Sequence, residues 1–123
     1  MQLWLTVSGI SGLSAVALGA FGAHGLRDQV SEQALGWWQT AAQYHFIHTL
    51  LLLGLGLLLP RAANGTMLSV AGWLSLAGIV LFSGSLYAMA LGAPRWFGAI
   101  TPVGGLAWIA AWALLAWYGA VSQ

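Results

Sequence analysis

Four long apolar stretches alternate with short polar connections along this chain. They cover residues 3–21, 40–59, 66–91 and 102–119, and none of them contains aspartate, glutamate, lysine or arginine. Each stretch has roughly the 20 residues that an α-helix needs to cross a hydrocarbon core of about 30 Å. The pattern predicts an all-α membrane protein, a single domain over residues 1–123 with transmembrane helices near 3–21, 31–59, 66–91 and 102–120.

The connections between the predicted helices carry recognisable start and stop signals. Ser31 is placed to cap the second helix, and Pro60 is placed to end it. Thr66 is expected to cap the third helix, while Thr101 and Pro102 read as the N-cap and first residue of the fourth. Because all the connections are short, consecutive helices are expected to run antiparallel in an up-down-up-down bundle.

The tryptophans suggest where the membrane surfaces lie. Trp37, Trp38 and Trp96 fall near the ends of helices at one predicted face, and Trp4 and Trp117 fall near the other. Tryptophan is enriched in the interfacial layer of bilayers. We therefore expect two aromatic belts, one at each membrane surface.

Charged residues are few and lie at the ends of the apolar stretches. They make up 4% of the chain, against about 25% in soluble domains. All of them, Arg27, Asp28, Glu32, Arg61 and Arg95, avoid the predicted bilayer centre, where a charge costs at least about 2.5 kcal/mol. The chain has no basic patch, so the lipid bilayer is the expected partner and nucleic acid is not. It has no cysteine, which excludes thiolate metal sites.

Small residues recur at four-residue spacing on three of the predicted helices. In membranes such residues let helix backbones approach closely, and they often mark helix–helix contacts. We interpret them as packing positions within the chain, with a homo-oligomer or a larger membrane complex as a second use on another face. The positions are Ser11, Ala15, Gly19, Ala23, Gly84, Ala88, Gly104 and Gly105.

A group of polar side chains lies inside the predicted membrane region. On the second helix, helical spacing puts two histidines and two hydroxyl residues on one face, and that face must turn inward because an imidazole in hydrocarbon needs a hydrogen-bond partner. Hydroxyl residues on the third helix are candidates to meet them. The candidate site comprises Tyr44, His45, His48, Thr49, Ser83, Ser85 and Tyr87.

Three interpretations of these histidines stay open. Both can be neutral and bonded to serine, threonine or backbone carbonyl groups of neighbouring helices. Alternatively, His45 and His48 could share a metal or haem, with His24 or Tyr87 as a third ligand, although no acidic residue supports such a set. A proton-sensitive switch or a small-molecule contact is the third interpretation.

His24, Thr101 and Pro102 are candidate loop or cap positions. His24 lies where the first helix leaves the membrane, and it could close over a cavity or simply bond to the loop backbone. No Gly-x-Ser-x-Gly elbow and no acid completes a catalytic triad, so we expect no catalytic residue and no enzyme. We also predict no resident metal or cofactor.

Four segments in order resemble a known family. They are 19–24 (GAFGAH), 48–50 (HTL), 82–87 (FSGSLY) and 101–105 (TPVGG), and together they resemble domain-of-unknown-function family 423. This family consists of small bacterial inner-membrane proteins similar to the eukaryotic transmembrane protein 256. The resemblance implies four transmembrane helices in the inner membrane and no assigned activity. The positions that match its motifs are His24, His48, Ser83, Ser85, Tyr87, Thr101 and Pro102.

These observations favour a non-enzymatic structural, accessory or regulatory membrane component. One alternative is a small-molecule or proton-linked transporter that uses His48, although the helices carry no acidic residue in their cores. The other is a redox accessory that binds haem, a metal or a quinone through His24, His45 and His48.

Overall fold

A computed structural model describes residues 2–122, which fold into four long helical spans and contain no strand. The spans are Leu3–His24, Glu32–Arg61, Thr66–Ala90 and Arg95–Val121, each long and apolar enough to cross a membrane. The prediction of an all-α membrane protein with four helices is therefore confirmed. The elements in order are α1 (Leu3–His24), α2 (Glu32–Leu58), η1 (Leu59–Arg61), α3 (Thr66–Gly78), η2 (Ile79–Ser83), α4 (Gly84–Ala90), η3 (Arg95–Ala99) and α5 (Thr101–Val121).

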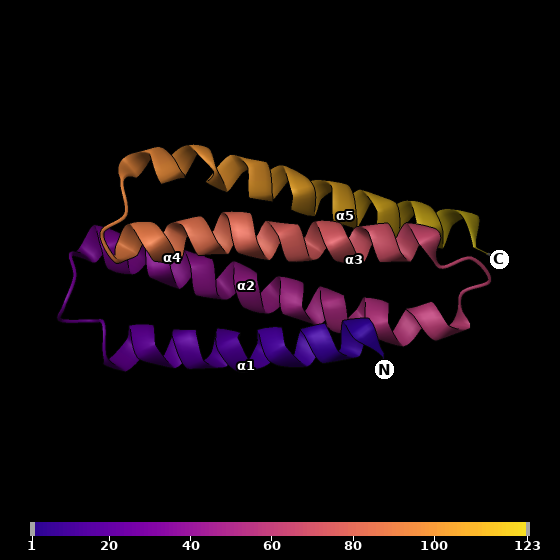
Figure 1. Cartoon of the computed structure of the whole chain (residues 1–123), viewed down its shortest axis with the longest axis horizontal. Coiled ribbons are helices and arrows are strands. Elements are labelled where there is room, and N and C mark those ends of the chain that lie inside the picture. Colours follow the sequence, from indigo (N-terminus) through magenta and orange to yellow (C-terminus); the bar gives the residue numbers. More distant parts are fainter. Residues whose placement is uncertain (1, 123) are drawn as a thin grey trace.

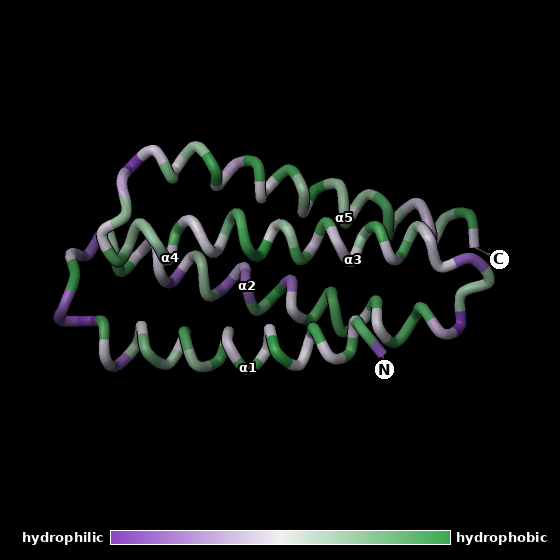
Figure 2. The backbone as a smooth tube through the Cα atoms, viewed as in Figure 1, coloured by the Kyte–Doolittle hydropathy of each residue, from purple (hydrophilic) through white to green (hydrophobic). Residues whose placement is uncertain are grey.

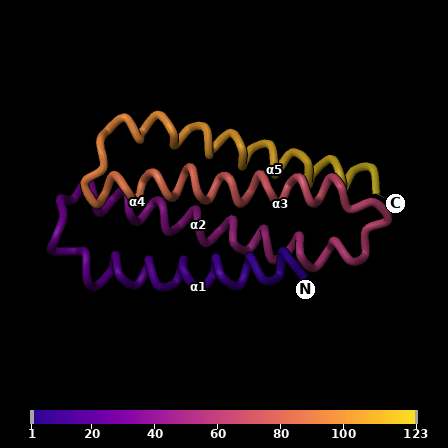
Figure 3. Tube along the Cα trace, in the orientation of Figure 1, coloured from indigo at the N-terminus to yellow at the C-terminus, as the bar shows by residue number. Residues whose placement is uncertain are grey.

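The spans lie side by side, with α2 and the α3–η2–α4 span in the middle (Figure 1). The chain reverses direction at each connection, and the two ends of the trace lie toward the same end of the molecule (Figure 3). Helix α1 packs mainly on α2, whereas α5 packs on α3 and η2. The two outer helices therefore each keep a long face free of other helices.

Most residues of the spans are hydrophobic or near neutral, and the strongly hydrophilic residues gather at the connections, with a few along α2 (Figure 2). Large side chains such as Leu13 on α1 and Ile109 on α5 are mostly exposed. In water an apolar surface of this extent would drive association, whereas a bilayer solvates it. This distribution fits a protein immersed in lipid.

One buried cluster joins all four spans. Trp4 of α1, Leu52 of α2, Ile79 of η2 and Trp108 of α5 pack together, each less than a tenth exposed. Helices in lipid are held by such close packing and not by exclusion of water. Trp108 of this cluster also stacks on His48 of α2, so the cluster helps to position the site described below.

Of the three predicted caps, Ser31 is confirmed, whereas Thr66 and Thr101 are not caps. Ser31 Oγ accepts from the backbone N–H of Ala34 at 3.1 Å and caps α2 as predicted. Thr66 is the first residue of α3, and its N–H donates to Asn64 Oδ1 instead, so the prediction that Thr66 is the cap is wrong. Thr101 also begins its helix without capping it, because its hydroxyl bonds to a neighbouring span.

The first helix ends later than expected. Helix α1 continues to His24, three residues beyond the predicted end at residue 21, and Gly25 follows with ordinary right-handed backbone angles. His24 therefore belongs to the last turn of a helix and not to a loop. The other predicted boundaries lie within two residues of the observed spans, except that the last span begins at Arg95 with the turn η3, seven residues before the predicted start at residue 102.

A π-helical turn interrupts the third span at Ile79–Ser83. The backbone N–H of Gly84 donates to the carbonyl of Ile79, one residue further back than in an α-helix. Such turns insert one residue and are often found at functional sites. Here the turn accompanies a contact across the membrane interior, since the buried Ser83 hydroxyl donates to the Ala41 carbonyl of α2 at 2.8 Å.

The small-residue pattern marks close contacts at only some of its positions. Ser11 and Ala15 are buried beneath α2, and a Cβ at Gly104 would collide with the backbone of Phe82. Gly19 has no neighbouring atom where a Cβ would stand, and Ala23 is exposed, so neither lies at a helix–helix contact within the described residues. Gly84, Ala88 and Gly105 are half-buried with looser surroundings.

Two tryptophans predicted for the membrane surfaces are buried between helices. Trp38 is 2% exposed and Trp4 is 5% exposed. The Trp38 indole rests against Gly22 of α1, where any side chain would collide with it, and its N–H donates to the Leu18 carbonyl at 2.8 Å. Trp96 and Trp117 remain exposed at the ends of the last span. Trp4 and Trp38 therefore pack between helices, whereas Trp96 and Trp117 face outward.

Candidate functional site

The two histidines of α2 are buried inside the membrane region and point to different neighbours. His45 and His48 are each 4% exposed, whereas Tyr44 is 42% exposed. His45 turns toward α1 and α4, and His48 turns toward α5. A separation of three residues along one helix thus gives two separate polar clusters.

His45 is the centre of a hydroxyl cluster that joins three spans. Its Nδ1 lies 3.0 Å from Tyr87 Oη of α4, and its Nε2 lies 3.2 Å from Ser11 Oγ of α1. Ser11 Oγ is in turn 2.6 Å from Thr49 Oγ1, and the Thr49 hydroxyl donates to the His45 carbonyl at 2.9 Å. We call these four residues the hydroxyl cluster.

The directions of these hydrogen bonds follow from counting protons. The single Thr49 hydroxyl proton goes to the His45 carbonyl, so Ser11 must donate to Thr49. Ser11 Oγ then has no proton left for His45 and accepts from its Nε2–H. An imidazolium without a counter-ion is costly in the membrane interior, so His45 is neutral. With its single proton on Nε2, its Nδ1 accepts from the Tyr87 hydroxyl.

His48 lies in a cluster of aromatic rings. Its ring stacks on Trp108 with centroids 3.7 Å apart and planes 4° from parallel. Its Nε2 accepts from the Trp112 indole N–H at 3.0 Å, and its Nδ1 donates to the Tyr44 carbonyl at 2.8 Å. We call His48, Tyr44, Trp108 and Trp112 the indole cluster.

The partners of His48 determine its tautomer. An indole nitrogen can only donate and a carbonyl oxygen can only accept. His48 therefore carries its proton on Nδ1, the opposite arrangement from His45. Both rings are neutral and both use each nitrogen once, which is how buried polar groups avoid the free-energy cost of an unmade hydrogen bond.

The third histidine lies elsewhere. His24 is exposed in the last turn of α1, and the described residues contain no group of three histidine, aspartate or glutamate side chains that could hold a metal ion. Tyr87, the other predicted third ligand, does reach His45, but as a hydrogen-bond donor. The structure therefore does not bring His24, His45 and His48 together.

The other predicted polar residues form separate helix–helix contacts. Ser83 bonds to α2 through the Ala41 carbonyl. Ser85 donates to the Phe82 carbonyl at 2.9 Å and lies 2.5 Å from the Thr101 hydroxyl of α5. Pro102 is exposed in the first turn of α5. Of the third-span candidates, only Tyr87 belongs to a histidine cluster.

Trp108 and Trp112 are site residues that the sequence analysis did not single out. Trp108 also donates its N–H to the Ser75 carbonyl at 3.0 Å, so it bridges α5 to α3 while it carries the His48 ring. The sequence did contain a signal for them. A histidine inside the membrane needs a hydrogen-bond partner there, and an indole N–H can supply it.

A groove opens to the lipid between α1 and the α3–η2–α4 span. It encloses about 470 Å³, and its walls include Val7 and Ile10 on one side and Ile79 and Val80 on the other. The side chain of His45 lies at its floor. The hydroxyl cluster is therefore next to this groove, whereas His48 of the indole cluster does not line it.

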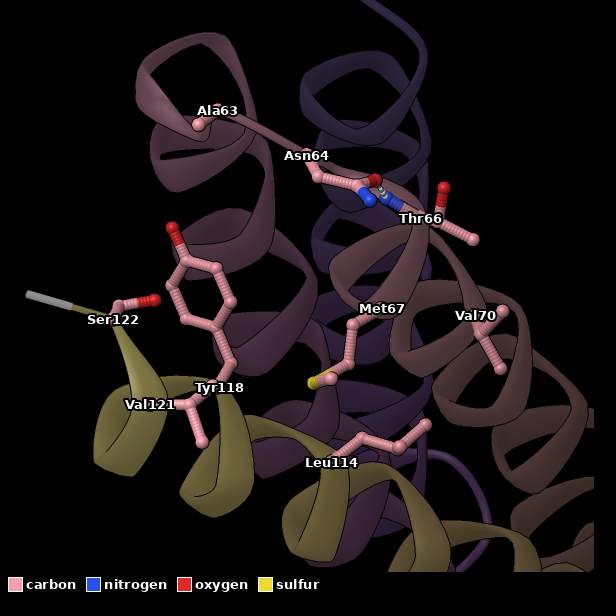
Figure 4. Close-up of a pocket in the computed structure, with 9 residues that line it drawn as sticks. All are labelled: Ala63, Asn64, Thr66, Met67, Val70, Leu114, Tyr118, Val121 and Ser122. Carbon is pink, nitrogen blue, oxygen red and sulfur yellow. Dashed lines mark hydrogen bonds between the residues drawn. The ribbon is translucent and has the colours of Figure 1, made fainter.

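A second pocket lies where the connection after η1 meets the end of α5 (Figure 4). It encloses about 530 Å³, and the side chains of Met67, Val70 and Leu114 line it together with Tyr118 (Figure 4). Asn64 and Thr66, joined by the hydrogen bond of the α3 cap, lie at its edge. None of the sequence-predicted site residues borders this pocket.

Comparison with known proteins finds membrane proteins whose names state no activity. The family described as "Protein of unknown function (DUF423)" matches residues 18–105. The chain is 43% identical over 115 residues to the UPF0382 membrane protein YwdK of Bacillus subtilis, covering 94% of each chain. It is 42% identical over 114 residues to a UPF0382 membrane protein of Haemophilus influenzae, covering 93% of this chain and 90% of the relative.

A further relative carries a location in its name. The UPF0382 inner membrane protein YgdD of Escherichia coli is 44% identical over 93 residues, covering 76% of this chain and 70% of the relative. No solved structure matches the chain. With its four apolar spans, the chain is a multi-pass protein of the bacterial inner membrane.

Proposed function

The chain belongs to the DUF423 family of membrane proteins of unknown function, and we propose that it is a non-enzymatic structural, accessory or regulatory component of the inner membrane. One observation carries this proposal. Both ring nitrogens of His45 and of His48 are engaged by partners within the chain. The intramembrane polar groups are thus used to join helices, and neither histidine offers a free nitrogen for chemistry.

The outer helices are the surfaces through which such a component would assemble. Helices α1 and α5 leave most of their length facing lipid, and each packs chiefly against a single neighbouring span. In a bilayer, helices associate by van der Waals contact and hydrogen bonding. The proposed partners are a second copy of this chain or another membrane protein.

The transporter alternative requires His48 to gain and lose a proton, which its surroundings do not favour. A coupling residue must exchange protons with water, but the His48 ring is covered by the Trp108 indole and is bonded at both nitrogens. The redox alternative meets a similar obstacle, because His45 or His48 would have to give up an existing hydrogen bond to ligate iron or another metal. The geometry thus supports the structural role better than either.

The test is to capture partners in the native membrane before solubilisation. A photo-crosslinking amino acid at Leu13 of α1, and separately at Ile109 of α5, samples the two lipid-facing surfaces, and the same residue at the buried Leu68 is the matched control. Native mass spectrometry then identifies the products. Adducts of this chain with itself or with one recurrent protein, absent from the Leu68 control, are expected.

Two results would contradict the proposal. A lone monomer at both lipid-facing positions would remove the assembly role. Stoichiometric mass from a haem, a metal ion or a quinone, lost when His45 or His48 is replaced, would favour the redox alternative instead.

A further inference from the structure

The lipid-facing groove beside the hydroxyl cluster combines an apolar wall with a polar floor. Val7 and Ile10 of α1 face Ile79 and Val80 across it, and these residues lie within the membrane spans. The polar side chains on it are those of Ser11, Ser14, His45 and Tyr87. A molecule that enters this groove must come from the bilayer and must carry an apolar chain.

Every proton on the polar floor is already donated. Tyr87 donates to His45, His45 donates to Ser11, and Ser11 donates to Thr49. Ser14 donates its hydroxyl proton to the Ser11 carbonyl at 2.9 Å. The hydroxyl oxygens of Tyr87 and Ser14 each keep lone pairs that no described side chain uses. The groove thus offers hydrogen-bond acceptors and no spare donor.

We propose that this groove is a binding site for a lipid with a free hydroxyl head group, such as a long-chain or isoprenoid alcohol, whose O–H donates to Tyr87 Oη or Ser14 Oγ. A hydroxyl adds a bond and leaves the hydroxyl cluster intact. A lipid head group with only carbonyl or ether oxygens finds no donor unless Tyr87 abandons His45, which would leave His45 Nδ1 without a partner. The arrangement of protons therefore selects for a donor.

The wall of the groove supports a built site independently of the polar floor. The π-helical turn Ile79–Ser83 supplies part of that wall, and such turns are frequent at functional sites. Gly84, directly after the turn, also lines the groove, and a Cβ there would meet only the Ile79 carbonyl at 3.9 Å. The space in front of Gly84 is open for an apolar chain.

The experiment uses the full chain in phosphatidylcholine nanodiscs with a diazirine-bearing hexadecanol as photoprobe. The labelled residues are mapped by mass spectrometry, with unlabelled hexadecanol and hexadecyl methyl ether as competitors of equal chain length. We expect labelling of groove residues of α1 and α4, and competition by the alcohol about two- to tenfold stronger than by the ether, the ratio one net hydrogen bond supplies.

Two variants with matched controls locate the site. Gly84→Leu fills the groove and should abolish the labelling, whereas Gly9→Leu adds the same side chain at an exposed position of α1 with open space around it and should not. The triple variant Ser14→Ala, His45→Phe, Tyr87→Phe removes both proposed acceptors and the His45 Nδ1 that would otherwise replace Tyr87, so it should remove the preference for the alcohol. Tyr118→Phe, outside the groove, should keep the preference.

Three outcomes would overturn the proposal. Equal competition by alcohol and ether would remove the hydroxyl requirement. Unchanged labelling in a folded Gly84→Leu variant would move the site elsewhere. Labelling spread evenly over all lipid-facing positions would leave no site at all.

Discussion

His45 and His48 lie three residues apart on one helix, and the hydrogen bonds of their buried rings are satisfied by different kinds of partner. His45 is held by small hydroxyl groups from α1, α2 and α4, and it borders a groove that opens to lipid. His48 is held by aromatic groups, with Trp108 covering its face and Trp112 bonding to its edge. The two rings carry their protons on opposite nitrogens.

The indole cluster is a fixed contact between helices, whereas the hydroxyl cluster has oxygens that can accept further hydrogen bonds. In the indole cluster both ring nitrogens of His48 have a partner and the Trp108 indole covers its face, so the cluster fixes α5 against α2. In the hydroxyl cluster the Tyr87 oxygen, like that of the neighbouring Ser14, keeps unused lone pairs beside the groove. A ligand or partner would therefore act on His45 and not on His48.

The largest effect is expected from emptying the indole cluster. His48→Ala removes a ring stacked on Trp108 and leaves the Trp112 N–H without its acceptor. We expect the free energy of unfolding to fall by about 3–5 kcal/mol, the range for loss of a buried aromatic ring. Unfolding in mixed micelles monitored by circular dichroism measures this. A loss below that of His45→Phe would reverse the order of the two clusters.

The next effect tests the hydroxyl cluster. His45→Phe keeps a ring but leaves Tyr87 and Ser11 without their partner, and we expect a loss of about 1–3 kcal/mol. A double-mutant cycle with Tyr87→Phe should show coupling of about 0.5–1.5 kcal/mol for His45. The same cycle between His48→Phe and Tyr87→Phe should show none, and comparable coupling in both would mean that the clusters are not separate.

A smaller effect comes from the glycine beneath a buried tryptophan. Gly22→Ala places a methyl group against the Trp38 indole and should cost about 1–3 kcal/mol through overpacking. Gly19→Ala, one turn away on the same helix with open space around it, should change the unfolding free energy by less than about 0.5 kcal/mol. The pair is measured in the same unfolding assay, and equal losses would contradict the contact.

The smallest effect is expected at the third histidine. His24→Ala changes an exposed side chain at the end of α1 and should leave stability within about 0.5 kcal/mol. Crosslinking patterns in the membrane should also stay the same. A loss as large as that of His45→Phe would show that His24 works with the buried histidines after all.

The sequence was sufficient for the spans and for the inward direction of the histidines. Charge-free stretches of membrane length have few structural alternatives, and an imidazole in hydrocarbon has to face other helices. The caps were harder, because Thr66 and Thr101 have the residue type of a cap but take part in other contacts. Residue type alone does not say which of two hydrogen bonds forms.

Three features were beyond the sequence reasoning for physical reasons. The π-helical turn at Ile79–Ser83 carries no propensity signal, since its residues suit an α-helix equally well. Trp4 and Trp38 were assigned to the membrane surfaces because tryptophan prefers them on average, yet a glycine on a neighbouring helix admits an indole into the interior. Four-residue spacing of small residues indicates a face but not the helix it meets, so it did not show that Gly19 and Ala23 lie outside the close contacts within the chain.

The most direct test of the two-cluster account is nitrogen-15 NMR of the histidine rings in a bilayer at neutral pH. The account predicts two neutral rings with opposite tautomers, a protonated Nε2 in His45 and a protonated Nδ1 in His48, assigned by comparison with His45→Phe and His48→Phe. The same tautomer in both rings, or a ring protonated on both nitrogens, would contradict it.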